Sequence, residues 1–154
     1  MPGVHHMIEI GARPERVFSV LADFSNDPKW RSKVVEMIPL GAAGDALGGI
    51  WSRQVEVRQV PGRQIRTEAV ITAFEPSRKI GFKRASGPIR PEGTYTLTDL
   101  GGRARLEFRL DVTLAGAQVL LTPLIALMLA AIVRPTLPGD FMRLKMLVEA
   151  AGHA

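Results

Sequence analysis

The sequence predicts an α+β fold in which one antiparallel β-sheet packs against a single long C-terminal helix. Three observations lead to this prediction: strand-like alternation changes to helical spacing within residues 8–23, hairpin signals then follow one another as far as residue 114, and residues 114–133 carry no charged side chain. A sheet with one apolar face must bury that face against another layer. The uncharged segment is the only stretch long enough to provide it.

The first strand leads directly into a helix. Ile8 and Ile10 alternate with Glu9, which is the period-2 pattern of a half-buried strand. Pro14 suits the first turn of a helix because its missing N–H needs no partner there, and Glu15 favours the positive end of the helix dipole. The apolar residues that follow recur at helical spacing, namely Val17, Phe18, Val20 and Leu21.

A short second helix and a series of strands are expected next. The helix covers residues 25–30, with Ser25 or Asn26 as its N-cap. Strands are expected over residues 34–40, 50–60, 63–74, 80–82, 94–98 and 103–114, separated by glycine- and proline-rich turns. The last strand is the clearest, because its even-numbered residues are apolar and its odd-numbered residues are polar or charged.

The long C-terminal helix is expected between about residues 114 and 151, interrupted near Pro135 or Pro138. Its uncharged first part approaches the length that spans a bilayer, about 20 apolar residues. We favour a helix that covers the sheet over a membrane anchor, because polar residues such as Gln118 dilute the segment and the sheet needs a cover. The protein is therefore expected to be soluble without detergent. A peripheral membrane contact through the apolar end stays an open alternative.

Composition narrows the range of functions. With 154 residues the chain is expected to form a single domain, residues 1–154. The absence of cysteine excludes disulfides, thiolate metal sites and a cysteine nucleophile. The net charge of +5 comes from fifteen arginines and five lysines without a basic block, so no nucleic-acid partner is expected. The start of the chain shows no signal-peptide pattern, which fits a cytoplasmic location.

No metal and no cofactor are expected. The three histidines, His5, His6 and His153, lie within a few residues of the ends of the sequence. Adjacent residues of a strand point to opposite faces, so His5 and His6 do not make a shared metal site. A histidine general base is not expected either, because chain ends lie far from buried pockets.

A set of short motifs occurs along the chain in this order: Ala12-x-Pro14-Glu15-x-Val17-Phe18-x-x-Leu21-x-Asp23, Trp30, Gly48-Gly49, Phe74-Glu75-Pro76-x-Arg78-x-Ile80-x-Phe82, Tyr95-x-Leu97, Gly101-Gly102 and Leu144-Lys145-x-Leu147-x-Glu149. This order resembles the START-like superfamily (SRPBCC) of polyketide cyclases, dehydrases and lipid-transport proteins. The resemblance implies a helix-grip fold: a curved antiparallel sheet wrapped around a long C-terminal helix, with two short helices after the first strand. The interruption at residues 134–139 departs from the family, whose last helix is usually continuous.

The resemblance also implies a cavity between the sheet and the helix. The residues expected to line it are Trp51, Arg53, Val55, Arg84, Tyr95, Leu97, Phe108, Leu110, Leu124, Leu127 and Met128. Arg53 and Arg84 share the parity of apolar neighbours and are candidates to meet an anionic head group, with an outward orientation at the rim as the alternative. Tyr95 is either a satisfied core residue or a hydrogen-bond donor to the ligand.

The predicted function is the binding of a hydrophobic small molecule, lipid or polyketide-like, because a lining poor in polar groups selects its ligand by burial. Two alternatives stay open: an enzyme of the polyketide cyclase or dehydrase type, and a protein-interaction module without a physiological ligand. No catalytic residue is assigned. Asp23 and Asp27 suit cap or turn positions, Glu56 is expected to face solvent, and Glu68 is ambiguous. The identity of the ligand and the oligomeric state stay open.

Overall fold

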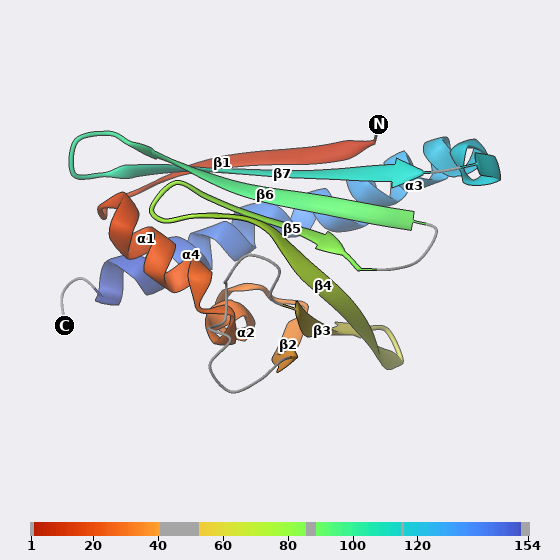
Figure 1. Ribbon diagram of the computed structural model, residues 1–154, viewed down its shortest axis with the longest axis horizontal. Coiled ribbons are helices and arrows are strands. Elements are labelled where there is room, and N and C mark those ends of the chain that lie inside the picture. The colour runs from red at the N-terminus through yellow and green to blue at the C-terminus, as the bar shows by residue number, and fades with distance from the viewer. Residues whose placement is uncertain (1, 41–52, 86–88, 115, 152–154) are drawn as a thin grey trace.

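The computed structural model describes residues 2–40, 53–85, 89–114 and 116–151. They contain one seven-stranded antiparallel sheet with the order β1-β7-β6-β5-β4-β3-β2 (Figure 1). The strands are β1 (Gly3–Ile10), β2 (Val34–Leu40), β3 (Arg53–Val60), β4 (Arg63–Glu75), β5 (Lys79–Arg84), β6 (Ile89–Asp99) and β7 (Ala104–Leu114). From β2 to β7 each strand pairs with its neighbour in sequence, and β1 lies beside β7. The predicted fold class is confirmed.

Two short helical stretches follow β1, as predicted. α1 (Pro14–Ala22) begins at a proline and buries its apolar side. The 3₁₀ turn η1 (Phe24–Asn26) and the single turn α2 (Asp27–Trp30) come next. Asn26, one of the two predicted residues, stands at the N-cap position of α2, but its side chain caps no N–H; instead the Asp23 carboxylate accepts the backbone N–H of Ser25 at 3.2 Å at the start of η1. A charged carboxylate is a stronger acceptor for such an N–H than a hydroxyl or an amide.

The C-terminal helical region is built from five pieces. They are the 3₁₀ helix η2 (Gly116–Leu121), α3 (Thr122–Met128), the π turn η3 (Leu129–Val133), the 3₁₀ turn η4 (Arg134–Thr136) and α4 (Leu137–Ala151). The predicted interruption is confirmed at Pro135, which has no N–H for the helical ladder, so local π and 3₁₀ turns replace regular α-helix around it. Pro138 falls in the first turn of α4, where the missing N–H is tolerated.

The helix α4 packs along the concave face of the sheet and completes the core. Leu137, Phe141, Leu144 and Val148 are its buried apolar residues, and they recur at helical spacing. They join one core cluster with side chains from α1, α2 and the sheet. Among the described residues, the largest fully buried side chains include Trp30, Ile10, Leu21, Ile71, Ile80, Leu106 and Leu144.

The region before α4 does not cover the sheet as predicted. Residues 116–133, called the arm below, begin beyond the end of β7 and return toward α4 (Figure 1), with η3 in contact with β1, and within the arm only Ile125 and Leu129 are buried. Leu124, Leu127 and Met128 are exposed, so their predicted place in the cavity lining is wrong. The reason is that the arm turns Ile125 and Leu129, four positions apart, toward the core, so Leu124, Leu127 and Met128 are left on the solvent side. By length and composition alone, the stretch Gly116–Ala151 could cross a membrane.

Candidate functional site

A cavity of about 250 Å³ lies between the concave face of the sheet, the end of α2 and the start of α4. It is lined by Trp30, Arg31, Glu56, Arg58, Thr67, Ala69, Phe82, Lys83, Arg84, Pro91, Tyr95, Phe108, Leu110, Val133, Thr136, Leu137, Asp140 and Phe141. Small-molecule pockets typically start at roughly 300 Å³, so this cavity suits a compact ligand or one that extends beyond the enclosed part.

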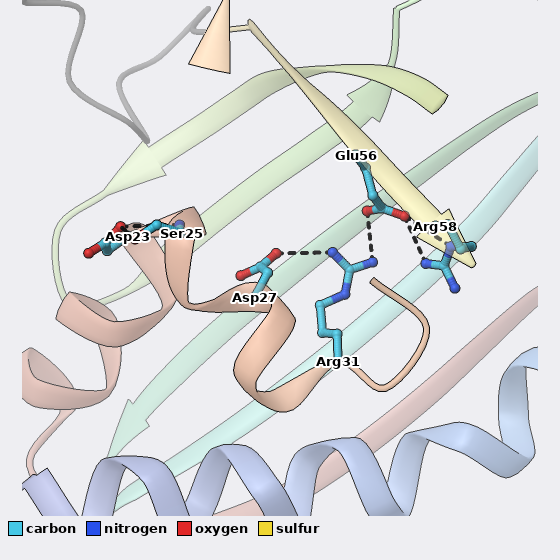
Figure 2. Close-up of polar contacts among 6 residues, drawn as sticks. All are labelled: Asp23, Ser25, Asp27, Arg31, Glu56 and Arg58. Atoms are coloured by element: carbon cyan, nitrogen blue, oxygen red, sulfur yellow. Dashed lines mark hydrogen bonds and ion pairs between the residues drawn. The ribbon is translucent and has the colours of Figure 1, made fainter. Parts of the chain in front are cut away.

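One side of the site is a chain of alternating charges, the Arg31 cluster, which consists of Asp27, Arg31, Glu56 and Arg58 (Figure 2). The Arg31 guanidinium donates from Nη1 to Asp27 Oδ2 at 3.0 Å and pairs through Nη2 with Glu56 Oε2 at 2.9 Å. The other Glu56 oxygen, Oε1, accepts from Arg58 Nε at 3.0 Å and Nη2 at 2.9 Å. Arg31 therefore bridges α2 and β3.

Local structure explains how Arg31 reaches this position. Asp27 opens the single turn α2, and Arg31 follows its last residue, so the two side chains lie one turn apart on the same side. The Arg31 backbone N–H donates to the Asp27 carbonyl at 2.8 Å. A second polar contact holds α2 against α4: Asp140 accepts the N–H of Ser32 at 3.1 Å and bonds Arg143, which also donates to the Trp30 carbonyl at 3.2 Å.

Burial and pairing shift the pKa values of the Arg31 cluster in different directions. Burial raises the pKa of Asp27 to about 6, because the neighbouring Arg31 charge compensates only part of the lost hydration. Burial also opposes ionisation of Glu56, but the charges of Arg31 and Arg58 outweigh it and lower the Glu56 pKa. Burial disfavours the charge of Arg31, yet the facing acidic groups raise its pKa, so Arg31 stays a cation.

The opposite side of the site is aromatic. The ring centroids of Tyr95 and Phe108 lie 5.1 Å apart, those of Tyr95 and Phe82 5.6 Å, and those of Phe108 and Phe141 5.6 Å. Tyr95 is buried, which raises its pKa above the usual range, so its phenol keeps its proton at neutral pH. These rings provide an apolar wall with one neutral hydroxyl.

Two further residues shape that wall. Trp30 is 2% exposed, packs on Phe141 with centroids 5.3 Å apart, and its indole N–H has no hydrogen-bond acceptor within the described residues. Gly93 on β6 lies under the Phe82 ring, since a Cβ built there would lie 2.3 Å from Phe82 Cζ. The glycine lets the ring rest directly on the strand and keeps the cavity open.

Four of the predicted lining residues lie on the cavity: Arg84, Tyr95, Phe108 and Leu110. Leu97 is buried in the core but outside the lining, because α1 packs on that part of β6 and leaves no space there. The predicted residue Trp51 lies outside the described residues. Whether any of these residues contacts a ligand stays a prediction.

On β3 the predicted inward face is wrong. Arg53 is exposed and its Nη1 bonds Glu68 Oε1 at 2.9 Å, and Val55 does not line the cavity. Glu56 and Arg58 line it instead, so the expectation that Glu56 faces solvent is also wrong. The inward face of this strand is polar because it meets Arg31 rather than the apolar core, so hydrophobic alternation does not reveal its direction here.

Sequence reasoning missed the cationic partner of Glu56. Asp27 and Arg31 stand at i and i+4, and Glu56 and Arg58 at alternate positions of one strand, which are the spacings of local ion pairs. Those spacings were a usable signal for each pair separately. The contact between Arg31 and Glu56 joins α2 to β3 across 25 residues of sequence, and only the folded chain shows it.

A curved antiparallel sheet that holds a C-terminal helix, with two short helices after β1 and a cavity between sheet and helix, defines a helix-grip protein of the START-like superfamily (SRPBCC). The family described as polyketide cyclase/dehydrase and lipid transport matches residues 1–149. The chain belongs to this family. No curated protein sequence matches it significantly.

Solved structures share the fold over almost the whole chain. TTHA0849 from Thermus thermophilus has a TM-score of 0.75 at 20% identity and covers 97% of this chain and 99% of its own. A START superfamily protein from Mycobacterium smegmatis has a TM-score of 0.74 at 18% identity, covering 97% and 98%. The Zhui aromatase/cyclase from Streptomyces sp. R1128 has a TM-score of 0.76 at 16% identity, covering 96% and 93%. At these identities the likeness shows a common fold.

Proposed function

We propose that this protein binds an apolar small molecule, lipid or polyketide-like, that carries an acidic or carbonyl group at one end. The observation that supports the proposal most is the division of the cavity lining. Tyr95, Phe108 and Phe141 provide an aromatic wall against which the apolar part of a ligand can be buried away from water. Arg31 and Arg58 provide guanidinium groups on the other side.

The charges on the lining favour an anionic or electron-rich end group. Four basic side chains line the cavity, Arg31, Arg58, Lys83 and Arg84, against the two carboxylates of Glu56 and Asp140. Guanidinium groups bind carboxylates through paired, charge-assisted hydrogen bonds. Trp30 also lines the cavity, and its indole N–H, which has no acceptor within the described residues, is a further candidate donor for an oxygen of the ligand.

The direct test is displacement of a fluorescent apolar probe by fatty acids and by aromatic polyketides. Leu110→Ala is expected to widen the cavity and shift the preference toward bulkier ligands. Arg84→Ala is expected to lower the affinity for carboxylated ligands about tenfold, while the affinity for neutral analogues stays unchanged. Arg53→Ala, which removes a guanidinium from the exposed side of β3, is the matched control and is expected to change neither.

Failure of every probe and candidate ligand to bind would overturn the proposal and favour a protein-interaction module. Equal weakening of charged and neutral ligands by Arg84→Ala would refute the assigned role of this arginine. Ligand binding itself would then stand.

A cyclase-type enzyme is the second candidate, favoured by one observation. The Tyr95 phenol keeps its proton because burial raises its pKa, and it lies in the field of the Arg31 charge. Such a neutral hydroxyl can donate a hydrogen bond to a carbonyl oxygen and polarise it. Tyr95→Phe is expected to abolish turnover of a polyketide-like substrate if the protein is such an enzyme. In a carrier it changes only affinity, so kinetics and binding measured on one variant distinguish the two functions.

A further inference from the structure

The arm, residues 116–133, exposes an apolar surface that the sheet does not cover. Leu120 is 84% exposed and Ile132 is 61% exposed. The other large exposed side chains of the arm are Val119, Leu124, Leu127 and Met128. The described arm residues include no charged side chain. The helical stretch Gly116–Ala151, which contains the arm, reaches a mean hydropathy of 2.2 over 18 consecutive residues, and 11% of those residues are buried. Contiguous exposed apolar surface of this kind marks a binding face for a protein or a membrane.

The distribution of these side chains around the arm indicates which kind of partner covers its apolar surface. Leu124, Leu127 and Met128 fall at positions that differ by three and four residues, while Ala126, Ala130 and Ala131 expose the remaining sides. A helix that meets a second protein needs one apolar stripe and keeps polar residues elsewhere. Apart from Gln118 and Thr122, whose hydroxyl donates to the Val119 carbonyl, the exposed sides of the arm are apolar, which fits a hydrocarbon environment. We propose that the arm docks this protein on a lipid membrane.

Charge at the base of the arm fits an anionic lipid surface. Arg134 follows the arm directly and is exposed, and Lys83 and Arg84 lie at the end of β5. Lys83 and Arg84 line the same cavity as Val133, the last residue of the arm, so all these cations stand close to its base. The net charge of +5 adds a general attraction to anionic head groups.

The geometry limits how deep the arm inserts. The chain leaves the end of β7, turns through η2 and returns along α3 toward α4, so the arm is a projecting knob (Figure 1). α4 stays on the sheet through Phe141, Leu144 and Val148. The arm therefore enters one leaflet while the cations at its base meet the head groups. Resting on the proposed function, docking also brings the cavity, whose wall includes Val133, next to a source of apolar ligands.

The test is co-sedimentation of the full chain with vesicles of phosphatidylcholine, alone or mixed with phosphatidylglycerol. We expect binding that is stronger on the anionic vesicles and weakened by salt. The double variant Leu120→Asp/Leu124→Asp is expected to lower vesicle binding by at least about tenfold, because two exposed leucines no longer enter the hydrocarbon. The matched control is Met142→Asp/Met146→Asp, which changes two exposed residues of α4 outside the arm and is expected to keep binding.

Sedimentation velocity and probe binding without vesicles separate the remaining outcomes. A wild-type dimer that the arm variant converts to a monomer, together with no vesicle binding, would show that a second copy covers the arm and would overturn the proposal. Equal vesicle binding by the wild type and the arm variant would overturn it as well. The arm variant is expected to keep probe binding in the cavity. Vesicle binding without any probe binding would support docking and contradict the proposed function instead.

Discussion

Replacing Arg31 with alanine is expected to lower the free energy of unfolding by about 3–5 kcal/mol, the usual cost of removing one partner from a buried ion pair. The guanidinium neutralises two carboxylates, Asp27 and Glu56, whose side chains are 5% and 18% exposed. Without it both carboxylates stay in a site too buried for bulk water to solvate them fully. Chemical denaturation of the wild type and the variant measures the difference.

Arg53→Ala is the matched control for this prediction. Arg53 also pairs with a glutamate at 2.9 Å, but its side chain is 56% exposed whereas that of Arg31 is 16% exposed. An exposed ion pair contributes at most about 1 kcal/mol. Similar losses in the two variants would contradict the role assigned to burial in the Arg31 cluster. Arg31→Ala is also expected to weaken carboxylated ligands, because it removes a cation from the cavity lining.

The pH dependence of the free energy of unfolding is expected to reflect the titration of Asp27. Its pKa is about 6 in the folded protein against an ordinary value of 3.8 for the unfolded chain, so the folded state holds the proton more tightly. The stability contributed by Asp27 is therefore full below pH 3.8 and is lost as the pH rises through 6. Between about pH 7 and about pH 4.5 the free energy of unfolding gains about 2 kcal/mol from this group.

Asp27→Asn isolates this contribution. His6 contributes with the opposite sign below its ordinary pKa of 6.5, because burial lowers its pKa in the folded protein and acid then favours the unfolded chain. The difference in unfolding free energy between wild type and Asp27→Asn cancels the His6 effect and is expected to grow with acid in favour of the wild type. The pKa of Glu56 is lowered from its ordinary value of 4.5, so its own contribution falls mainly below that pH and is present in both proteins. A difference that stays constant across this window would refute the raised pKa of Asp27.

Both tests also bear on ligand recognition. Protonation of Asp27 removes one of the two carboxylates that Arg31 pairs with, which leaves the guanidinium more available to an anionic group in the cavity. Under the proposed function, stability and ligand affinity are therefore expected to be coupled through Arg31.

The sequence by itself determined the layers of this protein. Alternation in residues 104–114 reports which side chains of β7 face the core, because a sheet with one wet face allows no other pattern. The change of period at Pro14 places α1, and Pro135 places the break in the last helix. The same local rules place Tyr95, Phe108 and Leu110 on the cavity, since the apolar side chains of a half-buried strand point toward the core.

Only the tertiary structure determined how the Arg31 cluster is assembled and which side chains of the arm stay exposed. Glu56 and Arg58 face inward because Arg31 approaches β3 from α2. The alternation of apolar and polar residues along a strand does not reveal which partner a charged side chain has. Leu124 and Leu127 look like cavity residues by composition, yet α3 turns Ile125 toward the core and leaves both leucines exposed. Hydrophobicity along a chain states that a side chain avoids water, and only the arrangement of the other elements determines what covers it.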